Sequence, residues 1–213
     1  MQIDIDKLLE KYRSHPYQDY PIYSPHTGII RFKVKEGDAV VGPGGKWLEK
    51  PGTLLYIIER ERNPKKVTAL FDGTVADLRM DLNGEFIHAK ERVLTIRHRF
   101  TKDEVIDRIL KDVLDLFSAP QRARYYLVPE LSARLEKKEV QVPVEPGSEC
   151  IIMSLMKRDT LLKYDGERGV IYKVYFKNGD LVEEGDPLIG ICKPEQLSFV
   201  QTVVKKIRDE WEE

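Results

Sequence analysis

The stretch Gly28-Ile29-Ile30-Arg31-Phe32-Lys33-Val34 decides the fold class, because from Ile30 onward apolar and charged side chains alternate. An alternation with period two places one face of a strand in a core and the other face in water. The glycine that precedes it favours a turn, since glycine adopts backbone conformations that other residues avoid. The stretch therefore predicts a short β-strand that follows a glycine turn.

The same pattern recurs further along the chain. Each copy has a glycine turn, a β-branched strand, a second glycine turn, a short strand and a closing apolar strand. Three copies are visible, within residues 24–58, 69–96 and 169–191. One copy has too few strands to bury a core, so we expect two copies to pack face to face as a small sandwich. An unspecific β-sandwich with glycine turns is the alternative.

Between the second and third copies the apolar residues take the spacing of a helix. Thr101 and Glu104 form a capping box, and an apolar stripe follows them. We expect a mainly helical segment over residues 100–138, including a helix through residues 122–127. A final helix should open at Pro194. These stripes are expected to pack inside the protein rather than to fill a partner's groove.

Composition excludes several classes of function. The 213 residues carry a formal net charge of −1, so no global field favours nucleic acid. No apolar run approaches the roughly 20 residues that span a bilayer, and the N-terminus shows no secretory signal. We interpret Cys150 and Cys192 as buried thiols rather than a redox pair, and the four histidines lack metal-ligand spacing. A cytoplasmic protein is expected.

Met156-Lys157 is the most informative pair in the chain. Pro146-Gly147 opens an apolar strand before the pair, and the chain returns to Gly169 after it, so the pair is predicted to lie at the tip of a hairpin. A lysine at such a turn suits a swinging cofactor, because its amine is exposed while the flanking strands hold it stiffly. We therefore expect covalent modification of Lys157.

The run Gly147-Ser148-Glu149-Cys150-Ile151-Ile152-Met153-Ser154-Leu155-Met156-Lys157 resembles, without a gap, the biotinyl/lipoyl carrier domain family. Biotin carriers of that family typically read Glu-Ala-Met-Lys-Met at a hairpin between the two halves of a β barrel-sandwich. The resemblance implies that Lys157 is the biotin attachment site and that Met156 and Leu155 flank it as a recognition surface. A methionine before the lysine favours biotin, whereas lipoyl domains usually have an acidic residue there. The chain is also similar to bacterial biotin-attachment proteins, across most of its length.

The resemblance implies a carrier subunit without catalysis of its own, which holds carboxybiotin on Lys157 within a multisubunit biotin-dependent carboxylase. Its cofactor would be covalent biotin. Its partners would be biotin protein ligase and the biotin carboxylase and carboxyltransferase subunits, with a homo-oligomer left open and no nucleic acid or membrane involved. The chief alternative is a non-biotinylated scaffold or assembly subunit that uses carrier-like folds as interaction modules.

The expected fold class is α+β, with a biotinyl/lipoyl-like barrel-sandwich, a helical linker, a second abbreviated barrel-sandwich and a C-terminal helix. The expected segments are an N-terminal helix and lead-in (1–19), a carrier-like domain without an acceptor lysine (20–99), the helical segment (100–138), the second carrier-like domain (139–193) and the C-terminal helix (194–213). The second domain is expected to be abbreviated, because only residues 140–144 precede Gly147 as a strand.

Several residues depart from the family pattern. Ser154, Leu155 and Arg158 replace the usual Glu, Ala and second Met. In the first domain, alignment on Gly73 places Arg62 at the lysine position. A guanidinium stays protonated near neutral pH and cannot be acylated as a lysine amine can. The first domain is therefore expected to lack the cofactor.

Overall fold

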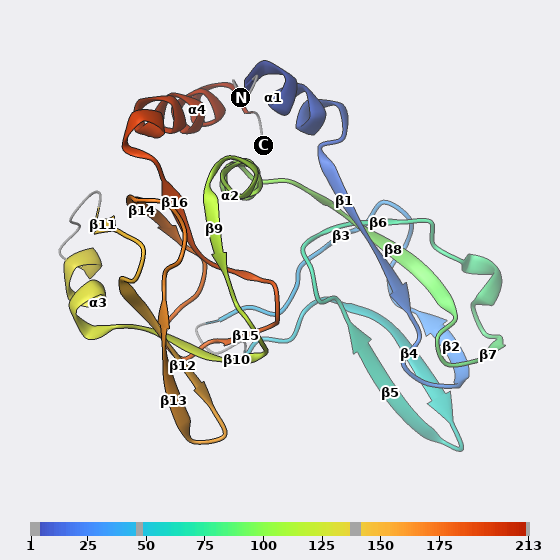
Figure 1. The fold of residues 1–213 in the computed structure, drawn as a ribbon. Helices are drawn as coiled ribbons and strands as arrows, with labels where there is room; N and C mark the ends of the chain where they lie inside the picture. The colour runs from blue at the N-terminus through green and yellow to red at the C-terminus, as the bar shows by residue number, and fades with distance from the viewer. Residues whose placement is uncertain (1–4, 46–48, 137–141, 212–213) are drawn as a thin grey trace. The chain divides into compact units, whose positions relative to one another are not determined.

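The structure is a computed structural model that describes residues 5–45, 49–136 and 142–211, and its fold is mixed α+β (Figure 1). The chain divides into two compact units. The N-terminal unit runs from Tyr12 to Thr101, whereas the C-terminal unit joins the chain from Lys102 onward with the residues up to Lys11. Among the described residues, no helix is long and apolar enough to cross a membrane.

Two antiparallel four-stranded sheets build the N-terminal unit, in the orders β1-β8-β6-β3 and β5-β4-β2-β7. Its elements are β1 (Tyr17–Tyr23), β2 (Gly28–Phe32), β3 (Ala39–Val40), β4 (Leu54–Arg60), β5 (Asn63–Thr68), β6 (Gly73–Ala76), the 3₁₀ turn η1 (Met80–Leu82), β7 (Phe86–Ile87) and β8 (Arg92–Arg99). Ile30 and Ile58 from one sheet share a buried core with Val75 and Ile96 from the other. Burial of each such side chain stabilises the unit by about 1.5–3 kcal/mol.

The C-terminal unit has a second pair of antiparallel sheets, in the orders β13-β12-β10-β15 and β11-β14-β16-β9. Its strands are β9 (Asp115–Ser118), β10 (Ala123–Leu127), β11 (Val142–Val144), β12 (Glu149–Leu155), β13 (Arg158–Lys163), β14 (Gly169–Val174), β15 (Leu181–Val182) and β16 (Pro187–Cys192). Its helices are α2 (Lys102–Val113), α3 (Pro129–Glu136), η2 (Pro194–Gln196) and α4 (Leu197–Glu210), and α1 (Ile5–Ser14) begins within this unit. Both sheets contribute to one buried core. None of the described sheets closes into a barrel.

The two units are copies of one topology. Replacing β1 to β8 by β9 to β16 converts the strand orders of the first unit into those of the second. The register is preserved as well, since Ile29 pairs with Glu59 and, 95 residues later, Arg124 pairs with Ser154. Side-chain contacts recur at the same shift. The Asn83 side chain accepts a hydrogen bond from Phe32 N–H at 3.0 Å, and the Asn178 side chain accepts one from Leu127 N–H at 2.8 Å. The half-repeat therefore occurs four times, not three.

The missing copy lies where the sequence predicts helices. Helices α2 and α3 do occupy parts of residues 100–138, but the helix predicted over residues 122–127 is wrong. That span is strand β10, in which Ala123 and Tyr125 are buried and Arg124 is exposed. Its partners β12 and β15 lie far along the chain, so local spacing did not reveal the pairing. The second fold is consequently not abbreviated, because β9 and β10 supply its first half.

Candidate functional site

Met156 and Lys157 form a two-residue turn between β12 and β13, as Leu155 pairs with Arg158 across the hairpin. Both turn residues have positive φ, 49° for Met156 and 63° for Lys157. Type I′ turns have this property and match the twist of such hairpins, but they favour Asn and Gly. A non-glycine residue held in the left-handed region costs about 1–3 kcal/mol. The turn itself therefore gives no structural reason for a methionine and a lysine.

The tip of this second hairpin is open to solvent. Lys157 is exposed, and the Met156 side chain has 90% of its surface exposed. Within the described ranges, the Lys157 amine forms no hydrogen bond or ion pair. Acylation of this amine would remove its charge without breaking an interaction of the fold.

The strand that leads to the tip is rigidly packed. β12 lies between β13 and β10, so both of its edges are paired. Cys150, Ile151 and Met153 point into the core of the C-terminal unit. At the base of the hairpin, Tyr164 N–H donates to Ser148 O at 2.9 Å. The turn is thus presented at the end of a stiff support.

A hollow of about 470 Å³ lies beside the turn. Its lining comes from β10 and the residue before it, from the hairpin and from β15, and consists of Arg122, Ala123, Arg124, Ser154, Leu155, Met156, Lys157 and Leu181. Leu181 is 51% exposed. Arg124 Nη1 donates to the carbonyl of Gly179 at 2.6 Å, and Arg122 Nε lies 3.1 Å from Glu183 Oε1. The hollow combines exposed apolar surface with two guanidinium groups.

The equivalent hairpin in the N-terminal unit, between β4 and β5, has the same turn. Arg60 pairs with Asn63, and the two turn residues have φ of 53° for Glu61 and 60° for Arg62. The prediction that Arg62 lies at the tip is confirmed, and Arg62 stands 95 residues before Lys157. An arginine side chain is not acylated as a lysine amine is, so this first hairpin offers no acyl acceptor at that position.

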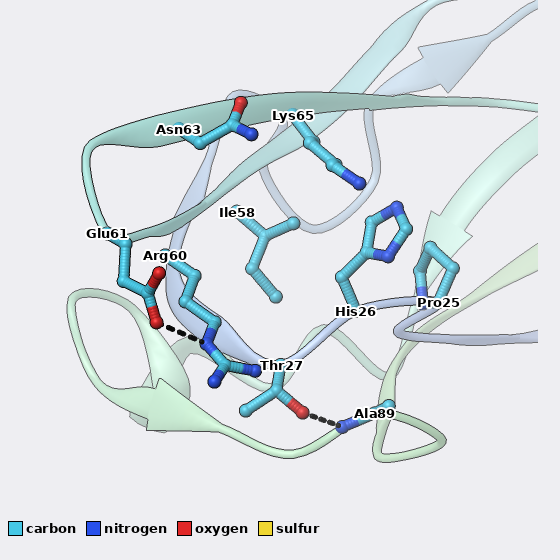
Figure 2. A pocket seen from close by; sticks show the side chains of 9 residues that line it. All are labelled: Pro25, His26, Thr27, Ile58, Arg60, Glu61, Asn63, Lys65 and Ala89. Atoms are coloured by element: carbon cyan, nitrogen blue, oxygen red, sulfur yellow. Dashed lines mark hydrogen bonds and ion pairs between the residues drawn. The ribbon is translucent and has the colours of Figure 1, made fainter.

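A hollow of about 480 Å³ also accompanies the first hairpin (Figure 2), but its chemistry differs. Arg60 Nε lies 3.3 Å from Glu61 Oε1, so the turn is partly neutralised by its own ion pair. Lys65 and His26 extend into the same space, near Ile58. The first hollow is therefore mainly polar, whereas the second presents leucine and methionine.

The two cysteines and the metal-ligating residue types offer no further reactive or metal-binding site among the described residues. Cys150 and Cys192 are free and buried, as predicted, and burial raises the pKa of the Cys150 thiol to about 11. The pKa of the Cys192 thiol is raised by burial as well. In the part of the chain that the structure describes, no group of three or more histidine, cysteine or acidic side chains could hold a metal ion.

Sequence reasoning placed Leu155, Met156 and Lys157 together, and the structure agrees, but it missed Arg124 and Leu181 beside them. A signal was present, because Asn83-Gly84 recurs as Asn178-Gly179 at a spacing of 95 residues. Applying that spacing to β2 would have identified residues 123–127 as a strand next to the hairpin.

No protein-family model matches the chain, and no curated protein matches its sequence. The assignment of a function therefore depends on the residues and their geometry.

Proposed function

We propose that the chain is a biotin carrier subunit of a multisubunit biotin-dependent carboxylase, with Lys157 as the attachment site. The observation that supports this best is the exposed amine of Lys157, without a partner in the described ranges, on a stiff two-residue turn. The amine fits an amide-linked prosthetic group, since it is a primary amine that projects from the fold. In this proposal the protein works in the cytoplasm, together with a biotin protein ligase.

The chain's own residues supply attachment and positioning. Lys157 would provide the nucleophilic nitrogen: its neutral amine would attack the acyl carbon of biotin that the ligase has activated with ATP as an acyl phosphate ester, the nucleotide phosphate would leave, and the nitrogen would lose a proton as the uncharged amide forms. Biotin, when bound, supplies a ureido ring that accepts a carboxyl group and passes it on. The rigid strand β12 keeps the root of the arm fixed, and tethering on a short arm gives effective concentrations of roughly millimolar at a partner's site. Biotin carboxylase and carboxyltransferase subunits would be those partners.

We also propose that both units have the fold of the carrier family. We regard each pair of sheets as the barrel-sandwich of the carrier family. Three features support this: each unit has one core shared by two sheets, the two sheets have equivalent strand orders, and the hairpin joins the first four strands to the last four.

The ligase would recognise the chain by contacting the residues next to Lys157. Met156 and Leu155 are exposed enough to be contacted, with Leu155 at 36% exposure. Ser154 pairs with Asp159 and takes the place of the family's glutamate, so a carboxylate is missing there. Arg158 adds a positive charge after the lysine. A ligase suited to this chain would rely on the apolar side chains rather than on an acidic one.

A scaffold subunit without biotin is the second candidate. The N-terminal unit already shows that this topology occurs here with an arginine at the tip. That unit also exposes apolar side chains outside its core, with Leu70 at 64% and Phe71 at 39% exposure. The Phe71 ring stacks on Tyr20 at 3.9 Å between centroids. Exposed apolar side chains mark a protein interface where they form a contiguous patch, and Leu70 and Phe71 are neighbours in the chain.

Co-expression with a biotin protein ligase distinguishes the two candidates. Intact-mass spectrometry should show one added biotin, and peptide mapping should place it on Lys157. Lys157→Arg keeps the positive charge and should abolish the added mass. Lys66→Arg, on β5 of the first hairpin, is the matched control and should leave the label unchanged. Wild-type protein that stays unmodified while a known carrier is labelled would favour the scaffold.

A further inference from the structure

We infer that the hollow beside Lys157 is a resting site for the ring of the tethered group, formed mainly by Leu181 and Arg124. The identity of that group rests on the proposed function. The residues of the resting site, however, come from β10 and β15 and lie outside the hairpin that carries the lysine. Their role can be tested separately from modification.

The apolar part of the hollow suits the arm. Leu181 is 51% exposed and Met156 is 90% exposed, so both present hydrocarbon surface to water in the unmodified protein. The valeryl chain of biotin and the methylene groups of Lys157 are apolar as well. Contact between these surfaces removes both from water, which favours a folded-back arm.

The polar part suits the ring. Arg124 is held in place by its hydrogen bond to the Gly179 carbonyl, at 2.6 Å from Nη1. A guanidinium has five N–H donors in a fixed plane, so Arg124 retains donors for a second acceptor. The carbonyl oxygen of a ureido ring is such an acceptor. Arg122 contributes a further guanidinium to the lining.

The first hairpin provides a natural control. At the positions 95 residues earlier, Ile29 replaces Arg124 and Phe86 replaces Leu181, with Ile29 again paired to Phe86. Phe86 is 58% exposed, so its substitution should disturb the fold as little as that of Leu181. Phe86→Ser therefore matches Leu181→Ser in strand position and exposure, and Phe86 is not part of the lining of the hollow beside Lys157.

The test uses Lys157→Cys coupled to a thiol-reactive biotin. Cys150 and Cys192 are buried and their thiol pKa values are raised, so the reagent should select position 157. The rate at which streptavidin binds the coupled biotin, measured by stopped-flow, reports the fraction of time for which the ring is free. If the ring rests in the hollow about three quarters of the time, capture is slowed about fourfold. Leu181→Ser and Arg124→Gln should each speed capture at least twofold, whereas Phe86→Ser should leave the rate unchanged.

Equal capture rates in all of these proteins would overturn the resting site. Circular dichroism checks that each variant is folded, and methyl NMR gives a second readout, since the Leu181 methyl signals should shift on coupling to biotin. Coupling is chemical, so the result does not depend on a ligase. If the variants speed streptavidin binding but a ligase does not label the wild type, only the carrier function is contradicted. If the ligase labels the wild type but the variants leave the streptavidin binding rate unchanged, only the resting site is contradicted.

Discussion

Tyr125→Ala tests whether residues 123–127 form a core strand. Tyr125 is fully buried, its ring makes an edge contact with Phe176 at 6.4 Å between centroids, and its hydroxyl donates to Gln121 O at 2.5 Å. Truncating a buried aromatic side chain costs about 3–5 kcal/mol. Tyr125→Phe removes only the hydroxyl and should cost about 0.5–1.5 kcal/mol.

Urea unfolding, followed by Trp211 fluorescence, measures the effect. Trp211 is 5% exposed and belongs to the C-terminal unit, and Trp47→Phe leaves it as the single tryptophan. With a slope of about 2 kcal/mol per molar urea, Tyr125→Ala should lower the midpoint by roughly 1.5–2.5 M. Leu161, which is 49% exposed on β13 of the same unit, should change stability by less than about 0.5 kcal/mol when it is mutated to Ala. If both alanine variants shift the midpoint equally, the burial of β10 is wrong.

Three further predictions concern other groups. Arg62→Lys should gain no biotin at residue 62 on co-expression with a ligase, because Glu61 stands where the second hairpin has a methionine. The mass of a second biotin on this variant would show that the turn alone is enough for the ligase to recognise a lysine. Cys150, whose pKa is raised to about 11 by burial, should be less than about 1% thiolate at pH 8 and should resist thiol reagents until urea unfolds the protein; fast labelling of the native protein would contradict this. Asp19 receives two hydrogen bonds from Arg97, at 2.8 and 3.0 Å, which lower the pKa of its carboxyl below the ordinary 3.8. Because the pKa is depressed in the folded state, the ionised carboxyl stabilises the fold at a pH above the pKa of the unfolded chain, and this contribution is lost as the pH falls through the pKa of the folded state. Asp19→Asn should therefore cost less than about 1 kcal/mol at pH 7 and nothing at a pH low enough to protonate Asp19. Urea midpoints measured at pH 7 and at that low pH would show the difference.

Local patterns predicted the elements whose signal is local. The apolar spacing after Thr101 corresponds to α2, which begins at Lys102, and the buried Val200, Val203 and Ile207 lie on α4. The glycine turns predicted β2, β3, β4, β6, β7 and β8 of the N-terminal unit, whereas β1 and β5 lie outside the predicted copies. The position of Lys157 followed from its flanking sequence, because a two-residue hairpin depends on neighbouring residues.

The strands β9 and β10 could not be found in this way. In β2 the first residue is Gly28, where a Cβ would lie 2.5 Å from Glu59 O, and the equivalent residue of β10 is Ala123. The glycine signature of the repeat is therefore absent. β9 pairs with β16, some 70 residues away, so its stability comes from contacts that a local window does not contain. The hollow beside Lys157 was missed for the same reason, since β10 and β15 supply part of its lining.

The division of the chain also constrains the order of folding during synthesis. Residues 12–101 are contiguous, so the N-terminal unit can fold as soon as it leaves the ribosome. Helix α1 is made before them, yet its residues up to Lys11, including the buried Leu9, belong to the unit that begins at Lys102. Until that later half exists, Leu9 has no core to enter within its own unit. A chain interrupted near residue 101 would therefore leave Leu9 exposed to water, and incomplete copies would offer this N-terminal segment to chaperones and proteases that recognise exposed apolar side chains.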